Sequence, residues 1–201
     1  MPRLLLATRN PAKVREYSLL FQGSPFPVTT LAEEGVNIEV SETGNTLEEN
    51  ARIKATAYAI QSQFLVVADD SGLEVEALGG EPGPLSARYA GKDATDKERI
   101  ALLLSRLQGV PWEKRTARFR CVIAIASSSR ILGLCEGECR GVINFEPKGE
   151  EGFGYDPIFY LPELDRTMAE LPLEEKNQVS HRGRAAQKAI QVLEYLRRGL
   201  Q

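Results

Sequence analysis

A continuous apolar segment of the 201-residue chain runs directly into two adjacent acids. Phe64 to Ala68 is apolar and β-branched without alternation, a pattern typical of a strand covered on both faces. Asp69 and Asp70 follow it, so we expect them at the C-terminal end of this strand, where open α/β sheets place their chemistry. Ser71-Gly72 then predicts a turn, and the alternation from Leu73 to Ala77 predicts a second, half-buried strand.

The pattern at the N-terminal end predicts a strand followed closely by a helix. Leu4 to Ala7 is typical of a buried strand, Asn10 is a good N-cap, and Pro11 suits the first helical position. The helix should reach about Gln22, because Gly23 ends it.

Three further helices and a hairpin follow from capping signals and periodicity. The pair Thr46 and Glu49 forms a capping box for a helix to about Ser62, and Thr95 and Glu98 form another. The expected buried stripes are Ala51, Ala55, Tyr58 and Ala59; Ile100, Leu103, Leu104 and Leu107; and, in the last helix, Ala186, Ala189, Ile190, Leu193 and Leu196. Extended segments are expected at Val36 to Val40, Arg115 to Ala126 and Ile131 to Glu138, the last two as a hairpin.

Composition places the chain among ordinary globular proteins. Its net charge is only −3, so no global field draws it to nucleic acid or an anionic membrane. No window approaches the roughly 18 uncharged apolar residues of a membrane span, and the early strand argues against a signal peptide. We therefore expect a cytoplasmic protein. The three cysteines, with one histidine in the chain, are predicted to be buried free thiols rather than a zinc site.

Two loops carry candidate chemistry. The segment Thr8 to Lys13 joins a strand to a helix N-terminus, whose backbone N–H groups and positive dipole end favour an anion. The alternative is a capped helix with a solvated lysine. Residues 152–157, GFGYDP, combine two glycines with two aromatics, which suits stacking on a planar ligand. Here the alternative is a turn with its aromatics folded inward. For the adjacent Asp69 and Asp70, we expect a cation or a shared proton, against the alternative of a simple polar turn.

Five segments in register carry a family resemblance. The segments ATRNPAK, SETGNTLEENA, ADDSGLEVEALGGEPGPLSARYAG, GFGYDPIF and EEKNQVSHRGRA resemble those of the inosine/xanthosine triphosphate pyrophosphatase family, from Leu5 to about Leu193. The resemblance implies an α/β fold with a long, highly twisted mixed β-sheet flanked by helices. It also implies that residues 1–201 form a single domain of two lobes with a central cleft, and that the protein is a homodimer.

The resemblance implies a magnesium-dependent hydrolase. Water would attack between the α and β phosphates of inosine, deoxyinosine or xanthosine triphosphate, giving the nucleoside monophosphate and pyrophosphate and so cleaning the nucleotide pool. Glu42 and Asp70 would hold Mg²⁺, a hard cation that prefers oxygen ligands, and Asp70 would also activate the water. Asp69 and Glu49 are possible supporting acids.

The substrate-binding residues implied by the resemblance fall into two groups. The triphosphate group includes Lys54, Ser71 and the whole first loop, with Thr8, Arg9, Asn10, Pro11, Ala12 and Lys13. The base group includes Phe153 as the stacking ring, completed by Gly154, Tyr155, Asp156, Lys176, His181 and Arg182. Many relatives have glycine where this chain has Arg9, whose side chain therefore either adds a phosphate contact or points to solvent.

A physical argument connects the base group to selectivity. The six-position oxygen of hypoxanthine or xanthine would accept from His181 or Arg182, whereas adenine's amino group would leave a donor unpaired, at a cost of about 1–3 kcal/mol, or roughly ten- to a hundredfold. We also considered a pyrophosphatase for modified pyrimidine nucleotides, which GFGYDPIF and SHRGRA argue against. A non-catalytic nucleotide sensor would not need both Glu42 and Asp70. A nucleic-acid binder is disfavoured by the charge balance.

Overall fold

A computed structural model describes residues 2–199 of the chain, which fold as a mixed α/β protein. The eight strands of the described residues form one sheet in the order β2-β1-β3-β5-β6-β7-β8, with β4 pairing with β3. Strand β1 runs parallel to β2 and β3, whereas β7 is antiparallel to β6 and β8. The mixed sheet with flanking helices confirms the predicted fold class. The strands are β1 (Leu4–Leu6), β2 (Val28–Thr30), β3 (Leu65–Val75), β4 (Pro82–Gly83), β5 (Thr116–Ser127), β6 (Arg130–Ile143), β7 (Phe159–Leu161) and β8 (Arg166–Thr167).

The chain divides into two compact units. Unit 1 comprises Met1–Asp70, Cys121–Gly137 and Arg182–Gln201, and unit 2 comprises Ser71–Arg120 and Glu138–His181. The α-helices of the described residues are α1 (Pro11–Leu20), α2 (Leu47–Ser62), α3 (Asp96–Arg106), α4 (Leu173–Val179) and α5 (His181–Arg198).

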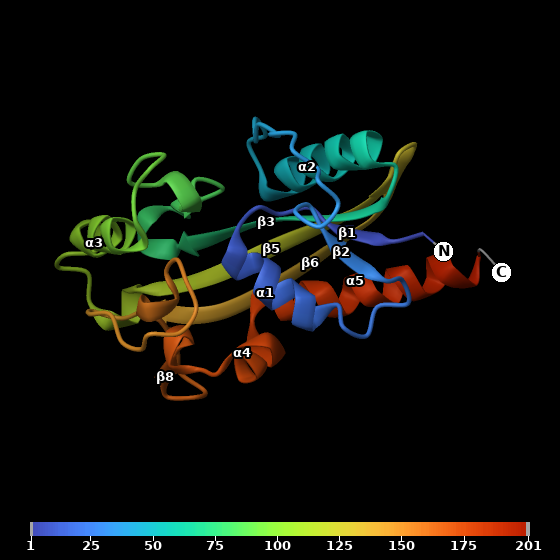
Figure 1. The fold of residues 1–201 in the computed structure, drawn as a ribbon. Coiled ribbons are helices and arrows are strands. Elements are labelled where there is room, and N and C mark those ends of the chain that lie inside the picture. The colour runs from blue at the N-terminus through green and yellow to red at the C-terminus, as the bar shows by residue number, and fades with distance from the viewer. Residues whose placement is uncertain (1, 200–201) are drawn as a thin grey trace. The chain divides into compact units, whose positions relative to one another are not determined.

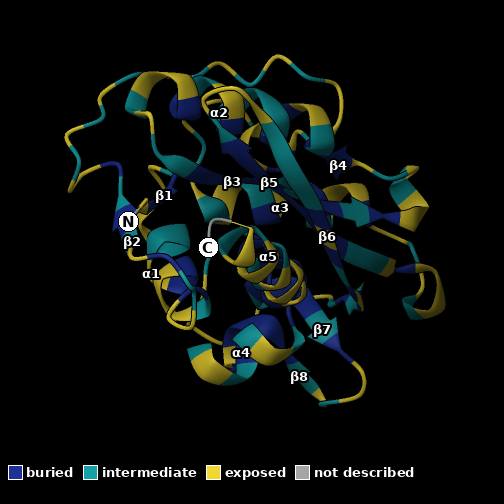
Figure 2. Ribbon diagram, turned by 90° about the vertical axis from the view of Figure 1, so that its right-hand side faces the viewer, coloured by how far each residue is buried: buried dark blue, intermediate teal, exposed yellow. Residues whose placement is uncertain are grey.

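In unit 1 the sheet lies between α2 on one face and α1 with α5 on the other (Figure 1). Successive strand side chains point to opposite faces, so Leu4 and Leu6 pack toward α1 and α5 whereas Leu5 packs toward α2. Both faces are covered, which explains the apolar runs without alternation in β1 and at the start of β3. Figure 2 shows the two sides of α5, whose buried side is formed by Ala185, Ala186, Ala189 and Leu193.

Strand β3 differs from the sequence prediction. It runs without interruption through Ser71-Gly72, so the predicted turn and the placement of Asp69 and Asp70 at a strand end were wrong. Glycine is needed here for close approach rather than for turning, since a Cβ on Gly72 would lie 2.3 Å from the Gly83 carbonyl oxygen. Strand β4 pairs at this point, and its neighbour Ser86 accepts a hydrogen bond from the Leu73 N–H at 2.9 Å.

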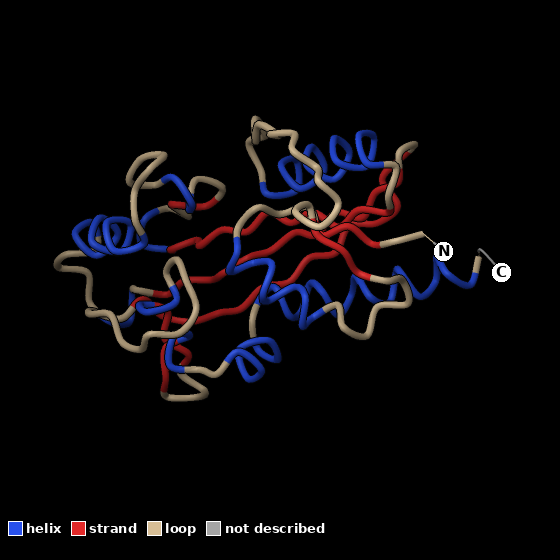
Figure 3. The backbone as a smooth tube through the Cα atoms, in the orientation of Figure 1, coloured by secondary structure: helices blue, strands red, loops and turns tan. Residues whose placement is uncertain are grey.

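The capping signals located the helices well. Asn10 caps α1, and both predicted capping boxes are formed at the starts of α2 and α3. Helix α1 ends slightly early, at Leu20, while β6 continues past Glu138 to Ile143. Helix α4 was not predicted, and the expected extended stretch Val36 to Val40 forms no strand but part of the irregular loop before α2, drawn in tan in Figure 3.

Unit 2 has its own core. The α3 stripe packs with Leu73 and Val75 of β3 and with Phe159 of β7, and Phe119 and Phe159 have ring centroids 4.5 Å apart. All three cysteines are buried as thiols outside any disulfide, as predicted. No helix among residues 2–199 combines the length and the apolar character that a membrane crossing requires.

Candidate functional site

The two acids of β3 point to opposite faces of the strand, and each meets a lysine in unit 1. Asp69 follows Val67 on the face covered by α1, and its Oδ2 accepts from Lys13 Nζ at 2.7 Å. Asp70 follows Ala68 on the α2 face, where its Oδ1 accepts from Lys54 Nζ at 3.4 Å. The predicted repulsion between the acids is therefore relieved by the pleat, which gives each carboxylate its own cation.

The first loop places a cation at the start of α1. Asn10 Oδ1 accepts from the backbone N–H groups of Ala12 at 2.9 Å and Lys13 at 3.2 Å, and Thr8 Oγ1 accepts from the Asn10 N–H at 3.3 Å. Two of the first-turn amides are thus already paired. The Lys13 ammonium, held by Asp69, opposes the helix dipole unless an anion is present.

Arg9 has a structural use that the sequence did not indicate. Its Nη2 donates to the carbonyl oxygens of Val36 at 3.3 Å and Ile38 at 3.0 Å. The side chain therefore ties the first loop to the irregular segment before α2.

The pKa values of the two acids are shifted in opposite directions, and that of Asp69 is lowered. Burial alone would raise its pKa, but Lys13, Lys54 and Arg182 together hold the pKa of Asp69 well below its ordinary value. Arg182, predicted to reach the base, lies buried in unit 1 with Nη1 3.1 Å from Glu16 Oε2. Glu16 is itself buried on α1 and was absent from the sequence-based site.

The pKa of Asp70 is instead raised above its ordinary value. Burial raises the pKa of Asp70, Glu42 adds to the shift, and Lys54 opposes it. Lys54 Nζ also donates to Glu42 Oε1 at 2.6 Å. Glu42 and Asp70 therefore both contact the Lys54 ammonium. Two carboxylates that contact one cation in this way could also share a metal ion.

The donor set at this point fits a hard divalent cation. Glu42 and Asp70 supply carboxylate oxygens, the ligands that Mg²⁺ prefers, and such a site normally completes its shell with waters and phosphate oxygens. No group of three or more potential metal-binding side chains gathers within residues 2–199. The Mg²⁺ site on Glu42 and Asp70 that the family resemblance implied stays a prediction.

Asn50 supports Asp70 and the loop that follows Glu42, and sequence reasoning missed it. Its side chain is fully buried, its Nδ2 donates to Asp70 Oδ2 at 3.1 Å, and its Oδ1 accepts from the Gly44 N–H at 2.9 Å. A Cβ on Gly44 would lie 2.8 Å from Asn50 Oδ1. The signal for Asn50 was a polar residue on the buried stripe of α2, one position before Ala51.

The aromatic loop in unit 2 is held by a buried ion pair. Lys176 Nζ lies 2.6 Å from Asp156 Oδ2, both side chains are 2% exposed, and the ammonium lies 5.1 Å from the Phe153 ring centroid. Asp156 Oδ2 also accepts from the Phe153 N–H at 2.9 Å. Lys176, Asp156 and Phe153, all predicted site residues, are thus brought together.

Other predicted base residues are placed differently. Tyr155 faces inward, buried in the unit 2 core with its hydroxyl donating to the Ser86 carbonyl oxygen at 3.0 Å. For Tyr155, one of the two aromatics of residues 152–157, the alternative of a side chain folded inward therefore holds. His181, also buried, stacks on Phe119 with ring centroids 4.6 Å apart. Ser71 is half-buried in β3.

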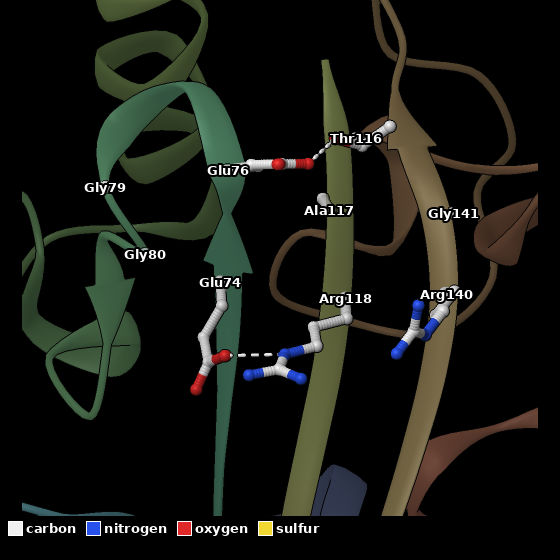
Figure 4. A pocket seen from close by; sticks show the side chains of 9 residues that line it. All are labelled: Glu74, Glu76, Gly79, Gly80, Thr116, Ala117, Arg118, Arg140 and Gly141. Carbon is white, nitrogen blue, oxygen red and sulfur yellow. Dashed lines mark hydrogen bonds and ion pairs between the residues drawn. The ribbon is translucent and has the colours of Figure 1, made fainter. Parts of the chain in front are cut away.

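A cavity of about 570 Å³ in unit 2 contains none of the predicted site residues (Figure 4). Both arginines of its lining already have carboxylate partners, since Arg118 Nε donates to Glu74 at 2.7 Å and Arg140 Nε to Glu138 at 3.0 Å. The lining consists of Glu74, Glu76, Gly79, Gly80, Thr116, Ala117, Arg118, Arg140 and Gly141.

Comparison with known proteins identifies the family. The model of the Ham1 family matches residues 4–192. The chain belongs to the Ham1 family. A dITP/XTP pyrophosphatase of Geobacillus kaustophilus (strain HTA426) is 51% identical over 188 residues, covering 94% of this chain and 92% of the relative. That of Bacillus subtilis (strain 168) is 47% identical over 194 residues, covering 96% and 98%.

Solved structures of Ham1 proteins share the fold. The HAM1 protein from Coxiella burnetii has a TM-score of 0.87 and 43% identity, covering 97% of this chain and 100% of that one. The Staphylococcus aureus Ham1 protein has a TM-score of 0.84 and 42% identity, covering 96% and 98%. Both comparisons extend over nearly the whole chain.

Proposed function

We propose that this chain is a nucleoside triphosphate pyrophosphatase that hydrolyses inosine, deoxyinosine and xanthosine triphosphates to the monophosphate and pyrophosphate. The relatives that are about half identical over nearly their whole length are named dITP/XTP pyrophosphatases. The observation that carries the proposal is the pair Asp69 and Asp70, which sit on opposite faces of β3, each holding a lysine.

The two lysines that contact these aspartates, Lys13 and Lys54, are suited to binding a triphosphate. Lys13 stands at the start of α1, where the dipole favours an anion, and Lys54 stands beside Glu42 and Asp70. Phosphate oxygens would compete with the carboxylates for both ammonium groups. Thr8 and Asn10 would hold the first loop in shape while the phosphates bind.

Asp70 is the candidate base for the attacking water. The pKa of Asp70 is raised by burial, which makes its carboxylate a better proton acceptor. Asn50 would fix its second oxygen, leaving the oxygen near Lys54 to take the proton. Ser71, the next residue of β3, would add a hydroxyl near the phosphates.

Glu42 and Asp70 are proposed to hold Mg²⁺. When bound, the ion would supply Lewis acid stabilisation of negative charge on the phosphates and lower the pKa of water. Release of Lys54 from the two carboxylates on binding would leave its ammonium for phosphate oxygens.

Unit 2 is proposed to recognise the base. Phe153 offers a half-buried ring, and Asp156 and Lys176 supply an acceptor and donors beside it. Gly154 next to it has a positive φ of 66°. His181 and Tyr155, both buried in unit 2, would support the residues that touch the purine.

We further propose that the protein acts as a cytoplasmic homodimer on free nucleotides and not on nucleic acid. The family resemblance implies the dimer, and the small net charge of −3 disfavours binding along a phosphate backbone. Sedimentation equilibrium measures the dimer directly, and a monomer at micromolar concentration would contradict it.

The deciding experiment measures pyrophosphate release from inosine, xanthosine and deoxyinosine triphosphates against ATP and GTP, with Mg²⁺ and after chelation. We expect release from the first three, loss on chelation, and a fall of about 100-fold or more in kcat for Asp70→Asn.

The matched control is Glu48→Gln, which changes an exposed acid on the same helix that holds Lys54. Its activity should equal that of the unmodified protein. Nucleotide binding without any pyrophosphate release would instead favour a sensor.

A further inference from the structure

Two carboxylates hold consecutive backbone amides of the aromatic loop in unit 2. Asp156 Oδ2 accepts from the Phe153 N–H at 2.9 Å, and Asp96 Oδ2 accepts from the Gly154 N–H at 2.7 Å. Asp156 belongs to the loop itself. Asp96 comes from α3, 58 positions earlier in the chain.

The loop has little intrinsic reason to keep one conformation. Phe153 stands between Gly152 at φ 76° and Gly154 at φ 66°, and glycine populates many backbone conformations at low cost. The sequence of this segment does not restrict its backbone, so each carboxylate adds a restraint by holding one amide. The hydrogen bonds to the Phe153 and Gly154 amides therefore fix the position of the Phe153 ring.

Asp96 is free for this task because other residues cap its helix. Thr95 and Glu98 form the capping box of α3, so the Asp96 carboxylate, at the first helical position, is not used for capping. One of its oxygens pairs with Arg99, which also donates to the Ala87 carbonyl oxygen at 2.9 Å. The other oxygen is aimed at the Gly154 amide.

We propose that Asp96 is a positioning residue for base recognition: it acts through the Gly154 amide to hold Phe153 where the purine stacks. This rests on the proposed function. The side chain of Asp96 bonds to the Gly154 amide and to Arg99, and it is not among the groups proposed to hold the phosphates, so its removal should weaken binding of the base and leave the phosphate chemistry intact.

The test compares Asp96→Ala, Asp96→Asn and Glu98→Ala. Loss of one hydrogen bond to a charged acceptor should raise KM for inosine triphosphate by about three- to tenfold in Asp96→Ala, with kcat changed by less than about twofold. Asp96→Asn keeps an acceptor oxygen at the same reach and should restore KM. Glu98→Ala weakens the start of α3 without touching the loop, so it should lower the melting temperature and leave KM unchanged.

Two readouts separate positioning from general damage. The inhibition constant of inorganic triphosphate, which has no base, should be the same in Asp96→Ala and the unmodified protein. Amide hydrogen exchange at Gly154 should be faster in Asp96→Ala than in Glu98→Ala, a measurement that needs no activity.

An unchanged KM, or an equal rise in the inhibition constant of inorganic triphosphate, would overturn the role of Asp96. If the unmodified protein released no pyrophosphate from any purine triphosphate, the proposed function would fail instead. Exchange at Gly154 would then still decide whether Asp96 holds the loop.

Discussion

At the scale of single residues, the site depends on a buried amide, that of Asn50, which hydrogen-bonds through both its nitrogen and its oxygen. Asn50 donates to Asp70 and accepts from the Gly44 amide. One side chain therefore fixes both the candidate base and the loop that carries Glu42. A buried amide is tolerated only when its hydrogen bonds are made. Its position is therefore tied to the geometry of both segments.

We expect Asn50→Ala to damage activity and stability together. Losing two buried hydrogen bonds should lower the free energy of unfolding by about 1–3 kcal/mol, and a misplaced Asp70 should lower kcat roughly 10- to 100-fold. Urea unfolding and steady-state kinetics measure the two effects. Glu48→Ala, on an exposed turn of α2, is the control; a full kcat in Asn50→Ala would show that Asp70 needs no support.

At the scale of elements, β3 explains why the two acids are useful. A strand that continued only to a turn at Asp70 would have left both carboxylates to solvent. Because β3 runs on to Val75, the pleat sends Asp69 toward α1 and Asp70 toward α2, and the helices supply Lys13 and Lys54. The continuation depends on β4 packing closely against Gly72.

Gly72→Ala should therefore be destabilising, although Ser-Gly in sequence resembles a tolerant turn. The added methyl would lie 2.3 Å from the Gly83 carbonyl oxygen, and such overpacking costs about 1–3 kcal/mol. The midpoint of urea denaturation tests this. Gly23→Ala, where a Cβ meets nothing within 4 Å, should leave the midpoint nearly unchanged, and equal midpoints for both variants would contradict the expectation.

At the scale of the whole molecule, buried ionisable groups set the alkaline limit of stability. Burial, with the charge of Asp69, raises the pKa of Tyr17 well above its ordinary value. The unfolded chain ionises this tyrosine near pH 10, whereas the folded protein keeps it protonated. The unfolded state therefore binds fewer protons above that pH, and stability is full below it and falls as pH rises.

We expect the urea midpoint to fall between about pH 9.5 and 11, and to fall less steeply in Tyr17→Phe, which cannot ionise. Tyr195→Phe changes a ring that is 77% exposed and should reproduce the original slope. A slope that Tyr17→Phe leaves unaltered would mean that other groups dominate the alkaline limit.

The sequence by itself determined the class of fold, the starts of α1, α2 and α3, and the family. Asn10, Thr46 and Thr95 cap their helices through bonds to residues two or three positions away, so local pattern is sufficient. Only tertiary structure decided that β3 passes through Gly72, that Tyr155 turns inward, and that Asn50 and Asp96 serve distant loops. Each of these depends on a contact with a segment remote in sequence, and periodicity carries no information about such a partner.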